Sequence, residues 1–352
     1  MASSRTYTVT GFTLLLFLGI LGAFLFLADL RRLGDVISHL DTRFLLLAVF
    51  ATTLSYFFNY LAFRGLARAV ACPLGGADLF RIAFASATVS CMFSAGGVSG
   101  MTLRLFFLKR QGIRTHTTLI ISLVSTMLNN VVLLLFVMAG FGHLMLRREL
   151  SPLQQALTSL IVLLSAGLVA AAFVSLYHRG VLDMMLRVGI RLARRVALAL
   201  PSLHLSRYLP EERLEAFRRE FHEAAALITS HRRKIAVPFL YLLLEWVAAA
   251  AVLYFCFVAT GHFMRPWVLA AGFSVGVFIF LISVVPGGLG IMEISMAGLY
   301  VSLGVPFEKV VVALLAYRTL YYFLPFGVSL VLCGKLLRDA GSASKLHDTA
   351  LP

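Results

Sequence analysis

The sequence predicts an all-α polytopic membrane protein, with about six full transmembrane helices and two re-entrant broken-helix hairpins in an inverted repeat. Three observations support this: a composition that is 60% hydrophobic and 13% charged, an uneven distribution of basic residues among the loops, and two matched glycine-broken apolar segments. A spanning helix needs about 20 apolar residues. Long charge-free runs therefore commit nearly all of the chain to the bilayer, and we treat residues 1–352 as a single membrane domain.

The apolar runs predict the elements in chain order. Full spans are expected at 10–28, 44–63, 115–141, 155–177, 235–260 and 308–334, and re-entrant hairpins at 79–110 and 267–304. The first span follows a single basic residue, Arg5, and has no small-residue cleavage site before Asp29. We therefore expect it to be a retained helix and not a signal peptide.

The loop charges predict the orientation of the chain in the membrane. With both hairpins returning to their own side, the predicted inner segments hold 23 Lys and Arg residues and the outer segments hold seven. Because inner loops carry the excess of basic residues, both termini are expected in the cytoplasm, in a bacterial cytoplasmic (inner) membrane. The net charge of +15 then reflects membrane topology, and no nucleic-acid partner is expected.

The longest inner segment, 179–234, predicts amphipathic basic elbow helices. Four arginines recur at helical spacing in its first part, and Pro210 with two following glutamates begins a second helix. Such helices are suited to binding anionic lipids at the cytoplasmic face. Packing on the cytoplasmic face of the bundle is the other interpretation, and both can hold together.

The two halves of the chain align when one is shifted by 191 residues. Gly96 and Gly97 then fall on Gly287 and Gly288, within a first repeat at 44–141 and a second at 235–334. Three full crossings separate span 44–63 from its counterpart, so the copies have opposite orientations. Paired interruptions in inverted repeats indicate a transporter binding site.

Each glycine break predicts a new helix beginning close to the middle of the membrane. Free amide groups at helix N-termini near Val98 and Leu289 would attract an anion, and a lipid phosphate headgroup is the natural ligand. The alternative is that the glycines only permit close helix packing.

Three charged residues fall deep within the predicted spans: Glu245, Glu293 and Arg318. Such residues are functional candidates by default. One interpretation has Arg318 bind a lipid phosphate, helped by Tyr321 on the same helix face, with Glu293 as counter-ion or proton-coupling group. The other is a buried Glu293–Arg318 pair that only locks the repeats together. Glu245 is either a second coupling candidate or a neutral packing residue.

The first repeat offers polar residues in place of these charges. Asn130 follows Asn129 within a span, and Arg104 follows the first hairpin tip, although it fits equally well in the cytoplasmic basic cluster. The predicted substrate-binding residues are Gly96, Gly97, Arg104, Asn130, Gly287, Gly288, Glu293, Arg318 and Tyr321. The four cysteines and nine histidines lack metal-ligand spacing, so no metal, cofactor or catalytic residue is expected.

These motifs resemble a known family. Pro286-Gly287-Gly288-Leu289-Gly290-x-x-Glu293, followed by Tyr317-Arg318, looks like the motif of the lysylphosphatidylglycerol synthase transmembrane (flippase-like) family. Phe93-Ser94-Ala95-Gly96-Gly97 with Arg104 resembles its first-repeat motif, and the likeness covers residues 10–335. The resemblance implies lipid translocation, of an aminoacylated phosphatidylglycerol in the best-known members and of other lipids in relatives.

The leading hypothesis is therefore a translocase for an anionic, aminoacylated or related phosphate-bearing lipid, and not an enzyme. Only 18 residues follow Gly334, so a separate lipid-synthesising enzyme would supply any aminoacyl lipid. The chain has no P-loop and no HExxH or DxD motif, which disfavours ATP-driven transport and a membrane transferase. An anion channel or an accessory subunit remains the alternative, and homo-oligomerisation stays open.

Overall fold

The computed structural model describes residues 30–70, 72–93, 98–113, 115–146, 152–177, 232–283 and 286–332, with a few single positions between 184 and 230. All regular elements in these ranges are helices. The predicted first span, 10–28, lies outside the described residues, as does nearly all of the predicted basic elbow, 179–234.

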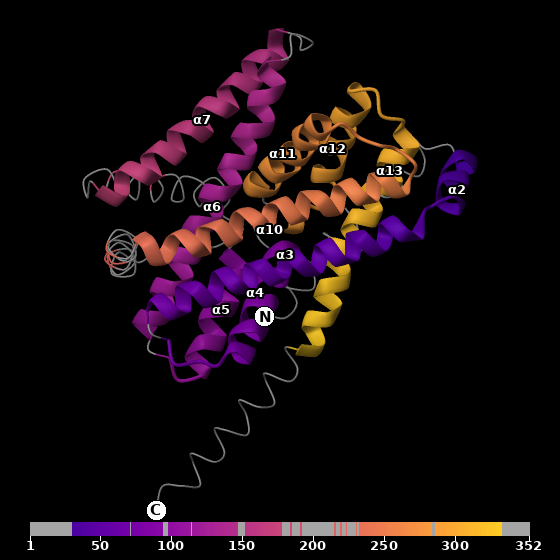
Figure 1. The fold of residues 1–352 in the computed structure, drawn as a ribbon. Helices are drawn as coiled ribbons and strands as arrows, with labels where there is room; N and C mark the ends of the chain where they lie inside the picture. Colours follow the sequence, from indigo (N-terminus) through magenta and orange to yellow (C-terminus); the bar gives the residue numbers. More distant parts are fainter. Residues whose placement is uncertain are drawn as a thin grey trace, which may run out of the picture.

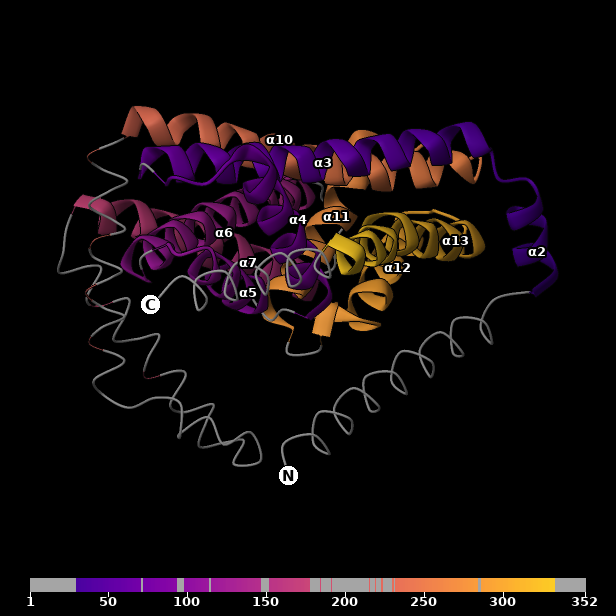
Figure 2. The ribbon, with the colours of Figure 1, turned by 90° about the horizontal axis from the view of Figure 1, so that it is seen from below.

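Two long helices, α3 (Thr42–Ala69) and α10 (Arg232–Ala259), form the structural scaffold of the molecule. They run side by side as one layer, and the other helices lie on one side of it (Figures 1 and 2). The pair is antiparallel, because the backbone N–H of Asp41, at the start of α3, donates a hydrogen bond to the carbonyl of Ala259, at the end of α10. At the other end of the pair, Gly65 lies so close to Pro238 that an added Cβ would sit 2.8 Å from its ring.

Both predicted hairpins consist of two helices folded back on each other. The first comprises α4 (Gly76–Phe93) and α5 (Val98–Arg110), and its tip, which includes Gly96 and Gly97, lies outside the described residues. In the second, α11 (Pro266–Ile282) packs along α12 (Ile291–Ser302), with a short 3₁₀ turn, η3 (Pro286–Gly288), between them. Small residues allow this close packing, as where Gly272 lies against the ring of Tyr300.

The turn of the second hairpin contacts the first hairpin at the end of α4. Gly287 in η3 packs against the last turn of α4, where its Cβ position lies 3.0 Å from the carbonyl oxygen of Met92 and 3.1 Å from that of Cys91. This contact joins segments nearly 200 residues apart in the chain. The turn of the second hairpin therefore lies beside the last turn of α4.

Helix α6 (Thr115–Leu146) packs against α11, and α7 (Pro152–Tyr177) folds back along α6. The Ser274 hydroxyl donates to the carbonyl of Phe136 across the α6–α11 contact at 2.7 Å. The far side of α7 exposes a row of leucines, Leu157, Leu160, Leu163, Leu164 and Leu168. An apolar surface of this extent fits contact with lipid.

The last span differs from the uninterrupted helix that the sequence predicts. Helix α13 (Phe307–Arg318) continues into a π-helical turn, η4 (Thr319–Phe323), before α-helix resumes as far as residue 332. Such π turns are rare and frequently occur at functional sites. The predictions also missed α2 (Leu30–Ser38), a short helix that packs against α13.

Length and composition support a polytopic membrane protein. Four of the described helices are long and apolar enough to cross a bilayer, at Thr42–Ala69, Thr117–Leu146, Lys234–Ala259 and Phe307–Leu332. They coincide with four of the six predicted full spans, and each extends beyond at least one predicted end, by one to six residues. Buried residues of α3, α6, α10, α11, α12 and α13 form the main core.

Candidate functional site

The second glycine break is a tight backbone turn that only glycine suits well. Gly287, Gly288 and Gly290 have φ values of 63°, 61° and 83°, in the left-handed region that disfavours a side chain. Helix α12 begins immediately afterwards. Its start is capped from within, because the backbone N–H of Gly290 donates to Glu293 Oε2 at 2.8 Å. The expectation of an amide left free for a ligand is therefore wrong at Gly290.

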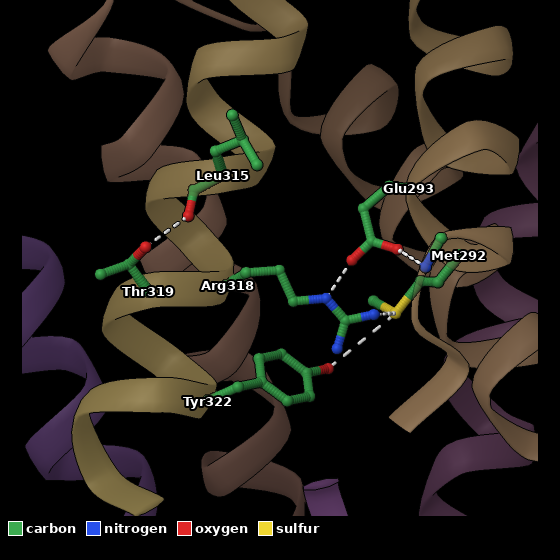
Figure 3. Close-up of polar contacts among 7 residues, drawn as sticks. Met292, Glu293, Leu315, Arg318, Thr319 and Tyr322 are labelled. Carbon is green, nitrogen blue, oxygen red and sulfur yellow. Dashed lines mark hydrogen bonds and ion pairs between the residues drawn. The ribbon is translucent and has the colours of Figure 1, made fainter. Parts of the chain in front are cut away.

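Glu293 also forms an ion pair with Arg318 of α13 (Figure 3). Arg318 Nε bonds Glu293 Oε1, its Nη2 lies 3.3 Å from Met292 Sδ, and its guanidinium lies 4.3 Å from the centre of the Tyr322 ring. Arg318 is 3% exposed and Glu293 8%. Both charges are thus buried and compensated within the protein, which is the condition under which a buried ion pair is tolerated.

A cavity of about 80 Å³ lies beside this pair, where the first hairpin meets α3, α6 and α10. Of the predicted site residues, it brings together Arg104, Asn130, Glu245 and Tyr321, while Gly287, Gly288, Glu293 and Arg318 are not among its lining residues. The complete lining is Asn59, Ala87, Ser90, Cys91, Gly100, Met101, Arg104, Ser125, Thr126, Asn129, Asn130, Leu133, Leu242, Glu245, Trp246, Phe280, Leu281 and Tyr321. The cavity draws on helices of both halves of the chain.

Glu245 enters the cavity wall from the middle of α10. Its two carboxylate oxygens accept hydrogen bonds from Asn59 Nδ2 of α3 at 2.9 and 3.0 Å, and its backbone carbonyl accepts one from Ser55 Oγ at 3.1 Å. The sequence-based prediction missed Asn59. The available signal was a lone amide side chain in an otherwise apolar span, opposite the only carboxylate of the neighbouring long helix.

Arg104 lies on α5, within the first hairpin. It is 8% exposed, whereas Lys109 and Arg110 farther along the same helix are exposed, so Arg104 belongs to the cavity and not to the surface basic cluster. Its Nε is 3.4 Å from Ser86 Oγ, and its guanidinium lies 4.9 Å from the centre of the Phe63 ring. The ion pairs found within the described residues do not include Arg104 or Glu245.

The π turn η4 presents two adjacent tyrosines to the two polar centres. Tyr321 lines the cavity and lies 3.2 Å from Ser55 Oγ, while Tyr322 covers the guanidinium of Arg318. The hydroxyl of Tyr56 donates to the Tyr321 carbonyl at 3.1 Å and so satisfies a backbone acceptor within the turn. The backbone at η4 thus joins the cavity to the ion pair.

The two asparagines of α6 take different roles. Asn129 Oδ1 accepts a hydrogen bond from Trp246 Nε1 at 3.1 Å, which ties α6 to α10. Asn130 lines the cavity beside it. The predicted glycines Gly96 and Gly97 lie outside the described residues.

Comparison with known proteins agrees with this architecture. The family described as "Lysylphosphatidylglycerol synthase TM region" matches residues 12–329. Phosphatidylglycerol lysyltransferases from Staphylococcus aureus (strain COL) and Staphylococcus haemolyticus (strain JCSC1435) are 41% and 40% identical to the chain over 88 residues. These stretches cover 25% of the chain but only 10% of either relative. Because the family match extends over most of its length, this multi-pass membrane protein belongs to the lysylphosphatidylglycerol synthase transmembrane region family.

Proposed function

We propose that the protein is a lipid translocase that moves a phosphate-bearing headgroup across the membrane through the cavity between the hairpins. The observation that carries the proposal is Arg104, a cation nine-tenths buried in the cavity wall with no carboxylate at ion-pair distance among the described residues. A buried charge is tolerated when it is paired. A phosphate group entering the cavity supplies the missing partner, and an arginine fork is well suited to bind it.

The architecture supports this route. Under the proposal, α4–α5 and α11–α12 are re-entrant hairpins of an inverted repeat, entering from opposite sides of the membrane. Two contacts support that arrangement: the repeat counterparts α3 and α10 lie antiparallel, and η3 packs on the end of α4. Hairpins that meet near the midplane can open toward one side and then the other around a fixed site.

The substrate follows in outline from the family. The relatives' name refers to phosphatidylglycerol, so we propose an anionic or aminoacylated phospholipid, or a related phosphate-bearing lipid, as the substrate class. The setting is a bacterial cytoplasmic membrane with both termini inside, and the segment 179–234 binds anionic lipids there. The chain itself is not an enzyme in this proposal, and a separate enzyme synthesises any aminoacyl lipid.

The contacts of Glu293 and Glu245 support only Glu245 as the proton-coupling residue of this proposal. Both oxygens of Glu293 are engaged, one by Arg318 and the other by the Gly290 amide. Glu245 faces the cavity, where its carboxylate has only the amide of Asn59 as side-chain partner among the described residues. A group that exchanges a proton or another cation during transport must be accessible from the cavity, so we assign this role to Glu245.

The test is translocation of acyl-labelled lipids in proteoliposomes, with Arg104→Gln compared against Arg110→Gln. Both variants lose one arginine of α5, but Arg110 is exposed and its guanidinium lies over the Phe106 ring. The proposal expects Arg104→Gln to abolish headgroup transfer and Arg110→Gln to retain it. Equal transfer by both variants would exclude the cavity as the route. Anion flux without lipid movement would instead establish the channel alternative.

A further inference from the structure

We infer that the cavity selects a zwitterionic phospholipid headgroup, with its phosphate beside Arg104 and a primary amine beside Glu245. The inference rests on the proposed translocation and names the lipid class that this site moves. It narrows the broad set of phosphate-bearing lipids to those whose phosphate and amine lie only a few bonds apart.

The two charged side chains of the cavity wall are the first reason to expect a zwitterionic headgroup. Arg104 and Glu245 are the only acidic or basic side chains among the described lining residues, and they come from different elements, α5 and α10. They line the same space without forming an ion pair with each other. An anionic headgroup would neutralise Arg104 but would lie close to the carboxylate, and like charges repel strongly where water is excluded. A headgroup with one charge of each sign leaves no charge of the wall uncompensated.

The hydrogen-bonding capacity of the two groups points the same way. A guanidinium has five N–H donors, and Arg104 donates to a single side chain among the described residues, at Ser86 Oγ. A carboxylate accepts about four hydrogen bonds, and the side chain of Glu245 receives them from a single amide nitrogen, that of Asn59. Each group therefore retains capacity toward the cavity. A phosphate can accept the hydrogen bonds that Arg104 can still donate. An ammonium group can donate the hydrogen bonds that the Glu245 carboxylate can still accept.

Asn59 orients the Glu245 carboxylate for binding an amine. One nitrogen bonds both oxygens of Glu245, which fixes the plane of the carboxylate while Ser55 anchors the backbone carbonyl of the same residue. A binding group whose orientation is set before the ligand arrives loses less conformational freedom on binding. Asn59 is therefore a positioning residue for amine recognition.

The chemistry of the two groups also bears on the spacing of the charges in the headgroup. Arg104 and Glu245 line one cavity, so a headgroup that contacts both must carry its phosphate and its amine within a short span. A phosphate with a two-carbon amine meets this demand, whereas glycerol supplies no cation for Glu245.

The experiment compares headgroups in proteoliposomes that contain the full chain. Phosphatidylethanolamine, phosphatidylcholine, phosphatidylglycerol and lysylphosphatidylglycerol, each labelled on an acyl chain, are followed by quenching of the label in the outer leaflet. The wild-type protein is expected to move phosphatidylethanolamine at least about tenfold faster than phosphatidylglycerol, a ratio that a buried charge contact readily provides. Phosphatidylcholine, which has the same charges but no N–H donors, should be slower than phosphatidylethanolamine.

The variant Glu245→Gln keeps the shape of the side chain but removes its charge. It should abolish the preference for phosphatidylethanolamine over phosphatidylglycerol, while Glu308→Gln, the same change at the start of α13 outside the cavity, should leave it intact. The wild-type headgroup series decides the matter even where Glu245→Gln fails to fold.

The outcomes separate the two proposals. Phosphatidylglycerol or lysylphosphatidylglycerol moving fastest in the wild type would overturn the zwitterion assignment while leaving translocation standing. Movement of no lipid at all would overturn the proposed function itself. A preference unchanged by a folded Glu245→Gln protein would show that amine recognition lies elsewhere.

Discussion

The Glu293–Arg318 pair makes the sharpest prediction, because its two interpretations differ in measurable ways. If the pair locks the second hairpin to α13, removal of either partner must destabilise the fold. Arg318→Met leaves the Glu293 carboxylate buried at 8% exposure without its cation, and Glu293→Leu leaves Arg318 buried at 3% exposure. Breaking one side of a buried pair typically costs about 3–5 kcal/mol.

The double variant Glu293→Leu with Arg318→Met should recover much of this loss. It leaves no unpaired charge, and apolar replacements of buried pairs are often close to neutral. Some cost remains, because the Gly290 amide loses its acceptor, and a lost helix cap costs roughly 1 kcal/mol. The two single variants together should cost about 6–10 kcal/mol and the double variant about 1 kcal/mol, so the double-mutant cycle should give a coupling energy of about 5–9 kcal/mol.

The assay is thermal unfolding of the purified protein in detergent, followed by tryptophan fluorescence and by the fraction that stays monodisperse. Each single variant should lower the Tm by on the order of 10 °C, and the double variant by much less. Translocation per folded molecule is measured on the same samples. A single Arg318→Met protein that keeps the wild-type Tm but loses transport would refute the lock and make Arg318 a substrate-binding residue.

Three further outcomes follow from individual contacts. Gly287→Ala should lower stability by about 1–3 kcal/mol, since it places a Cβ at positive φ against the carbonyls ending α4, whereas Gly298→Ala, with open space around it, should be neutral or stabilising in the same melting assay. Asn59→Ala should cost about 1–3 kcal/mol in that assay and slow transfer of amine lipids, because the Glu245 carboxylate loses its donor. Burial and the nearby Lys309 hold the pKa of His262, in the loop after α10, below its usual value, so the unfolded chain binds the proton more readily and stability should fall slightly as the pH drops through about 6.5, an effect absent in His262→Gln.

Much of the fold could be predicted from the sequence because membranes impose simple rules. Runs of about 20 apolar residues mark spans, and the described helices α3, α6, α10 and α13 begin within a few residues of the predicted positions. The breaks were also evident, since Gly287 and its neighbours adopt backbone angles that other residues avoid. The π turn η4 was not predictable, because it depends on tertiary contacts such as the Tyr56 hydroxyl that no local pattern encodes.

The site was harder to predict because depth in the membrane identifies charged residues but not their partners. The sequence-based interpretation gave Arg318 the leading role on its position within a span. Arg318 is paired with Glu293. Arg104, which its sequence position equally assigned to a surface basic cluster, is buried and has no carboxylate at ion-pair distance among the described residues. Asn59 was missed for the same reason, since its importance arises only from the antiparallel contact of α3 with α10.

The arrangement of the two polar centres suggests why the chain keeps both. Under the proposed function, transport requires a site that exchanges partners and a joint that does not. The two are adjacent but distinct: Arg104 and Glu245 line the cavity, while the ion pair connects the second hairpin to α13. Tyr321 and Tyr322 link them through one π turn. A change of helical register at this turn would move both tyrosines together. If the hairpins open during transport, these two tyrosines provide one connection between the cavity and the ion pair, so Tyr321→Phe should uncouple headgroup binding from transfer without weakening the ion pair.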